Sequence, residues 1–82
     1  MREIKRISEI QSLIEEIWLK YPDLRYLQLL HILQSGLSNQ NNDIGKIKVI
    51  EEDGFEKVGF DLFSIEDDVF IEYLKDVVKN GL

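Results

Sequence analysis

Residues 46–60 read KIKVIEEDGFEKVGF, and this stretch decides the fold class. Apolar and polar residues alternate over 46–49 and again over 55–60, which is the period of a β-strand. The Asp53-Gly54 pair between the two runs is a strong hairpin signal. The sequence therefore predicts an antiparallel hairpin over residues 46–60, in a chain whose remaining apolar residues follow helical spacing.

A two-residue turn at Asp53-Gly54 would also set the register of this hairpin. It would pair Val49 with Val58 and Ile47 with Phe60, so that all four side chains share one face. An isolated two-stranded ribbon is marginal in water. We therefore expect this apolar face to pack against the helices.

Three other stretches carry apolar residues at intervals of three and four, and they predict helices over residues 4–21, 23–35 and 65–80. Pro22 should end the first helix and begin the second. Gly36 is typical of a helix C-terminal cap, and Ser64-Ile65-Glu66-Asp67 has the spacing of a helix start. The predicted fold is α+β, in the order helix–helix–hairpin–helix, in a single compact domain over residues 1–82.

The composition narrows the classes of function. The chain of 82 residues carries a net charge of −6, which argues against direct binding of nucleic acid or of an anionic membrane surface. It contains no Cys and a single His, which excludes thiolate zinc sites and Cys nucleophiles. No apolar run approaches the ~20 residues of a membrane span, and no signal-peptide pattern is visible. We expect a cytoplasmic protein without a cofactor.

The acidic residues are concentrated in the second half of the chain. Residues 1–42 hold five basic and five acidic residues, whereas residues 43–82 hold five basic and eleven acidic ones. Asp68, Glu72 and Asp76 follow one another at intervals of four and so share one helix face. Such a face is more often solvated than metal-binding, and no EF-hand spacing is present. We predict no metal site, and we predict that these three carboxylates contact a basic partner protein.

Three aromatic residues, Trp18, Tyr21 and Tyr26, flank the predicted bend between the first two helices. They are either core residues or an exposed cluster that binds a partner, since Trp and Tyr dominate interface hot spots. Because Trp18 lies on the apolar stripe of the first helix, we expect Trp18→Ala to weaken the fold. His31 lies on a polar stripe without an orienting carboxylate, so it is interpreted as a surface residue and not as a general base.

Two segments resemble the YihD-like family of small bacterial proteins, a family without an established biochemical function. The matching residues are Lys5-Arg6-Ile7-Ser8-Glu9-Ile10, Trp18, Lys20-Tyr21-Pro22-Asp23-Leu24, residues 27–30, residues 61–68 and residues 70–74. They cover about half of the chain, and the spacing of Trp18 and Pro22-Asp23-Leu24 is the distinctive part. The Asp-Gly hairpin departs from what that family is expected to have. The resemblance implies a mostly helical compact domain and no active site.

These observations lead to a functional prediction. We expect a small acidic protein that is not an enzyme and acts by binding another protein, with candidate contacts at Asp68, Glu72, Asp76, Trp18, Tyr21 and Tyr26. The alternative is an acidic mimic of nucleic acid, in which residues 51–76 occupy the basic groove of a DNA- or RNA-binding protein. That alternative requires carboxylates spaced like phosphates on one surface.

Overall fold

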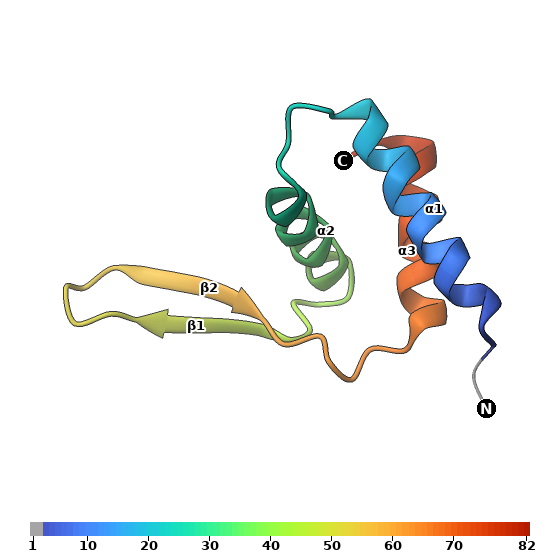
Figure 1. Ribbon diagram of the computed structural model, residues 1–82. Helices are drawn as coiled ribbons and strands as arrows, with labels where there is room; N and C mark the ends of the chain where they lie inside the picture. Colours follow the sequence, from blue (N-terminus) through green and yellow to red (C-terminus); the bar gives the residue numbers. More distant parts are fainter. Residues whose placement is uncertain (1–2) are drawn as a thin grey trace.

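The computed structural model describes residues 3–82, and its elements follow the order helix–helix–strand–strand–helix (Figure 1). They are α1 (Lys5–Lys20), α2 (Tyr26–Gln40), β1 (Lys46–Ile50), β2 (Glu56–Phe60) and α3 (Asp67–Asn80). The predicted α+β class and the order of elements in a single domain are confirmed.

The three helices form the helical body, in which α1 and α3 lie side by side and α2 packs beside them (Figure 1). Each helix turns its apolar stripe inward because residues three and four apart share a face. The stripes meet in one core of buried side chains: Ile17, Leu29, Leu33, Leu37, Tyr73, Leu74 and Val77. Polar contacts at the rim join α1 to α3. Among them, the Glu9 carboxylate lies 3.5 Å from the Lys75 ammonium, and Arg6 pairs with Asp67.

The start of α2 lies three residues later than predicted. Pro22 does not begin the helix but belongs to a turn, in which the Leu24 N–H donates to the Tyr21 carbonyl at 3.2 Å. Arg25 is extended at the N-cap, and its N–H donates to the Gln28 side chain at 2.9 Å. The side-chain oxygen of Gln28 thus satisfies a backbone donor at the helix start, as in one half of a capping box.

The end of α2 lies five residues later than predicted, because Gly36 is inside the helix and does not cap it. A Cβ placed on Gly36 would lie 2.0 Å from the Tyr73 hydroxyl oxygen. The glycine therefore makes room for the Tyr73 ring of α3. The helix continues through the buried Leu37 and Ser38, and the Ser38 hydroxyl donates to the Ile44 carbonyl at 2.6 Å.

The first and third helices differ less from prediction. The structure has α1 at Lys5–Lys20 in place of 4–21 and α3 at Asp67–Asn80 in place of 65–80. Ser64 is not the N-cap of α3, because Glu66 occupies that position. Gly81 closes α3 at a φ of 85°, a value that favours glycine.

The hairpin forms over the predicted residues, but its predicted register is wrong by one residue. Val49 pairs with Lys57, and Ile47 pairs with Gly59. The reason is the length of the turn. The Gly54 N–H donates to the Glu51 carbonyl at 2.9 Å, and Gly54 has a φ of 87°. This is the pattern of a three-residue loop that ends in a left-handed residue, whereas the prediction assumed a two-residue loop.

The change of register also overturns the predicted burial of the hairpin. A shift of one residue moves apolar side chains to the opposite face of a ribbon. Ile47, Val49 and Val58 are 46%, 52% and 40% exposed. Phe60 alone of the predicted four is partly buried, and its ring lies 5.5 Å from that of His31 on α2.

Residues 46–60, here called the hairpin arm, extend away from the helical body (Figure 1). A compact chain of this length has a radius of gyration of about 12 Å. The value here is 14.1 Å, and the longest dimension is 44 Å. The arm accounts for the difference because only its base approaches the helices, where α2 contacts β2.

Candidate functional site

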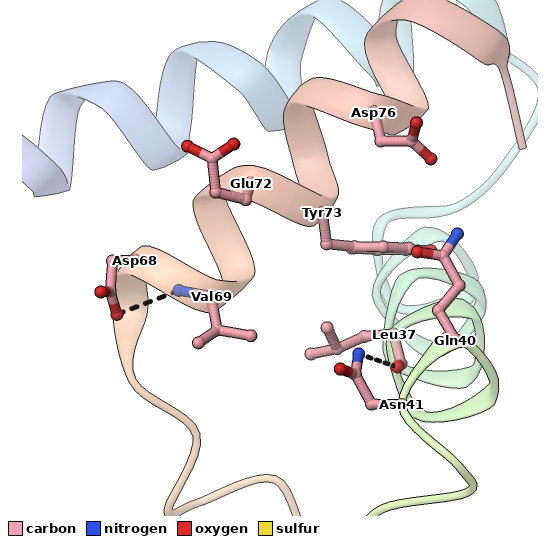
Figure 2. A pocket seen from close by; sticks show the side chains of 8 residues that line it. All are labelled: Leu37, Gln40, Asn41, Asp68, Val69, Glu72, Tyr73 and Asp76. Carbon is pink, nitrogen blue, oxygen red and sulfur yellow. Dashed lines mark hydrogen bonds between the residues drawn. The ribbon is translucent and has the colours of Figure 1, made fainter.

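The three predicted acidic residues line one open depression between α3 and the C-terminal end of α2 (Figure 2). It measures about 520 Å³, and its lining residues are Leu37, Gln40, Asn41, Asp68, Val69, Glu72, Tyr73 and Asp76. The structure thus brings Asp68, Glu72 and Asp76 into one row along α3, as the spacing predicted, and leaves all three exposed. We call these three residues the acidic row.

The carboxylates of the acidic row interact with their own helix. Asp68 accepts from the Val69 N–H at 3.0 Å, and Asp76 accepts from the Asn80 side chain at 2.7 Å. Glu72 lies 3.6 Å from the ammonium of Lys75. The row follows the helix axis one turn at a time, so the three groups do not converge on a common point (Figure 2).

Tyr73 lines the depression and also belongs to the core, so its side chain lies between the two. Its ring extends from α3 to the end of α2, beside Gln40 (Figure 2). Burial raises the pKa of the Tyr73 hydroxyl, and the nearby Asp76 carboxylate raises that pKa further. The hydroxyl therefore remains protonated in neutral solution and offers no general base.

The acidic side chains of the depression are spread along α3. Within residues 3–82, no three His, Asp or Glu side chains are grouped so that they could hold a metal ion. The row can attract a cationic surface, but attraction between exposed charges is weak and falls with salt.

The aromatic residues at the bend between α1 and α2 have structural roles. The Trp18 indole N–H donates to the Leu24 carbonyl at 2.8 Å, which fixes the turn before α2. Its ring lies 5.2 Å from that of Tyr26. The Tyr21 hydroxyl accepts from the Leu82 N–H at 3.2 Å and thereby holds the C-terminus. Of the three side chains, Trp18 and Tyr21 are half-buried against the core, and Tyr26 is 45% exposed.

Several exposed apolar side chains lie on the hairpin arm, which was not predicted as a site from the sequence. Ile50 and Phe55, at its far end, are 76% and 72% exposed. With Ile47, Val49 and Val58 they make five exposed apolar residues on one ribbon. Single exposed apolar residues are ordinary, whereas five on one short ribbon make the arm a candidate interaction surface.

The register distributes these residues over both faces of the arm. One face carries Ile50, Val58 and Phe60 with the Lys48–Glu56 ion pair, whose charged atoms lie 3.6 Å apart. The other face carries Ile47, Val49 and Phe55 with the Glu51–Lys57 ion pair at 3.1 Å. Each face therefore combines three apolar side chains with one neutralised pair of charges.

One signal in the sequence could have indicated this surface. Ile50 and Phe55 lie outside the apolar face that the predicted register produces, so that register already leaves two apolar residues off the face that packs on the helices. The direction of the arm could not have been found in this way, because it depends on how residues 41–45 leave α2.

Comparisons of the chain with protein-family models, with curated proteins and with solved structures gave no match. The resemblance to the YihD-like family therefore stays a prediction. Among the described residues, no helix is both long and apolar enough to span a membrane.

Proposed function

We propose that this chain is a non-enzymatic protein-interaction module and that the hairpin arm is its main contact surface. One observation supports the proposal above the others: five large apolar side chains are exposed on a ribbon that extends beyond the helical body. Moving one such side chain from water into an interface contributes about 1.5–3 kcal/mol before the costs of association.

The experiment compares two double variants that are matched in exposure. Ile50→Ser with Phe55→Ser removes the apolar end of the arm, where the two residues are 76% and 72% exposed. Leu27→Ser with Leu19→Ser is the control on the helical body, with the same exposed fractions. Each tagged variant is used to capture proteins from the source cells, and the captured proteins are quantified by mass spectrometry. We expect one or more partners to be lost with the arm variant and retained with the control.

The partner identified in this way is then purified and its Kd is measured. Because interface hot spots contribute 2 kcal/mol or more, the arm variant should bind at least about tenfold more weakly than the parent chain. Equal affinities for the two double variants would overturn the proposal. Circular dichroism of both variants verifies that the helices remain intact.

The acidic row supports a second proposal, the acidic mimic of nucleic acid. Its three carboxylates are exposed on one helix face. Two observations make it the weaker proposal. The carboxylates of the acidic row form one line along α3, and one of them, Glu72, already pairs with Lys75. A phosphate-like surface needs charge spread along both strands of a duplex groove.

Charge neutralisation separates the two proposals. Asp68→Asn, Glu72→Gln and Asp76→Asn together remove the acidic row, and each substitution conserves side-chain size. Under the first proposal the affinity for the partner at low salt stays unchanged. A large loss at low salt that disappears at high salt would instead support the mimic, since exposed charges act chiefly by steering association.

A further inference from the structure

The outer edge of β1 has no strand beside it within residues 3–82, where the sheet consists of β1 and β2 alone. The Gly45 carbonyl accepts from the Asp61 N–H at 2.7 Å, and the Glu51 N–H donates to the Phe55 carbonyl at 2.8 Å. Backbone groups alternate in direction along a strand, so Lys48 and Ile50 direct their N–H and C=O groups outward. All five residues of β1 are exposed. Such an edge is a template for another strand.

The charges along this edge indicate which strand fits it. β1 begins with Lys46 and Lys48, and Glu51 and Glu52 follow its last residue. An antiparallel copy of the same segment places the basic start of one strand beside the acidic end of the other, and the two-fold symmetry repeats this match. A parallel copy would place like charges together. Lysines on an edge normally repel a second edge, but this edge supplies the carboxylates that neutralise them.

We propose that a second copy of the chain binds to this edge through its own β1, so that the two hairpins form one antiparallel four-stranded sheet. The inference rests on the proposed function, because it takes the hairpin arm as the contact surface. A two-fold axis at Val49 places this residue opposite Val49 of the second copy, in a pair without mutual backbone hydrogen bonds. Lys48 and Ile50 then exchange their outward N–H and C=O groups with Ile50 and Lys48 of the second copy.

Two physical arguments favour this arrangement. A ribbon of two strands is marginally stable in water, whereas three or more strands with an apolar face are stable. Pairing also satisfies the outward backbone groups of β1 and surrounds Val49 with apolar neighbours, since Ile47 of each copy lies diagonally from Val49 of the other. Because α2 contacts β2 at the base of the arm, β1 is the strand that lies farther from the helical body (Figure 1).

A charge exchange tests the pairing through the charges of β1. One variant carries Lys46→Glu with Lys48→Glu, and the other carries Glu51→Lys with Glu52→Lys. In each variant alone, the charged residues at positions 46, 48, 51 and 52 all have the same sign, so two copies repel each other. Each variant should therefore sediment as a monomer at concentrations where the parent chain is a dimer. A one-to-one mixture should form a heterodimer, which native mass spectrometry identifies by mass. A parent chain that remains monomeric at millimolar concentration, or a mixture that stays monomeric, overturns the proposal.

A cross-linking experiment tests the position of the axis without relying on charge. The chain contains no Cys, so Val49→Cys introduces a single thiol. In the proposed pair the two Cα atoms lie about 4.5 Å apart, within the range that a disulfide spans. Under mild oxidation the Val49→Cys variant should become a covalent dimer much faster than Phe63→Cys, a control at a more exposed position (96% against 52%). Equal rates for the two variants contradict the pairing at Val49.

The two proposals fail in different ways. If the parent chain is monomeric and Val49→Cys behaves like its control, self-pairing is overturned. The capture experiment with the Ile50 and Phe55 variant still decides whether the arm binds another protein. If instead the arm variant and the Leu27 and Leu19 control capture the same proteins while the parent chain dimerises, the arm serves self-association alone.

Discussion

The helical body and the hairpin arm both contain regularly spaced apolar residues, yet they bury them to very different extents. Leu29, Leu33 and Leu74 in the body are fully buried, whereas Ile50 and Phe55 in the arm are about three-quarters exposed. In the body, three helices share one core, so each stripe has a partner. In the arm, a shift of one residue divides the apolar residues between two faces, and of these residues only Phe60, at the base, lies against a helix. The periodicity of a segment therefore predicts its local structure, but not what covers it.

The comparison is most directly tested by truncating one residue in each region. Leu74→Ala in the core should lower the free energy of unfolding by about 2–5 kcal/mol, because it leaves a cavity. Ile50→Ala in the arm should change it by less than about 0.5 kcal/mol, because the side chain is already exposed. Urea unfolding of dilute monomer, followed by circular dichroism, measures both values. Similar losses for the two variants would mean that the arm packs on the body in solution.

Trp18 tests how far the core extends toward the bend between α1 and α2. Its ring packs on the core, and its N–H donates to the Leu24 carbonyl. Trp18→Ala should cost about 3 kcal/mol, and Trp18→Phe should cost less because the apolar contact is largely retained. Thermal melts of both variants measure the order of these effects. A Trp18→Ala protein as stable as the parent would instead make Trp18 a surface residue and a candidate partner contact.

Two glycines provide a matched test of packing density. Gly36→Ala in the body places a methyl group 2.0 Å from the Tyr73 hydroxyl oxygen, whereas Gly59→Ala in the arm meets nothing within 4 Å. Overpacking costs about 1–3 kcal/mol, and the higher helix propensity of alanine offsets up to about 1 kcal/mol of it. We expect a net loss for Gly36→Ala and almost no change for Gly59→Ala. Gly36→Ala should cost less in a Tyr73→Phe background, and an equal cost in both backgrounds would contradict the assigned contact.

The smallest expected effect is a pH dependence that belongs to the body alone, since the arm contains no tyrosine. The folded protein raises the pKa of Tyr73 from 10.0, through burial and the Asp76 carboxylate. The neutral hydroxyl is thus favoured in the fold, and its contribution to stability is complete below pH 10. This contribution is lost as the pH rises through the folded pKa. Between about pH 9 and pH 11, the urea midpoint of the parent should fall more than that of Tyr73→Phe.

Particular residues show where sequence reasoning succeeded. The spacing of Asp68, Glu72 and Asp76 was sufficient to place them in one exposed row, because four residues make about one helical turn. The hairpin over residues 46–60 and the end of the third helix at residue 80 were also predicted. These features depend on contacts within one segment, and such contacts are encoded by neighbouring residues.

Other residues show where the sequence misled. Gly36 has the composition of a helix cap, but Tyr73, far along the chain, uses it as packing space. Asp53-Gly54 predicts a two-residue turn, but the Asp53 carboxylate accepts from the Phe55 N–H at 3.1 Å and Gly54 closes a three-residue loop. Both errors concern a choice between two local structures of similar energy, which packing or a single hydrogen bond can decide.

Local sequence patterns were sufficient to predict the elements of this protein, their order and the position of its charges, because periodicity, turn residues and carboxylate spacing act over short distances. Three features come from packing in three dimensions: α2 continues through Gly36, the hairpin register places apolar residues on both faces, and the arm extends into solvent. These outcomes depend on contacts between segments far apart in the chain. The free energy of such contacts depends on three-dimensional packing, which no local pattern records.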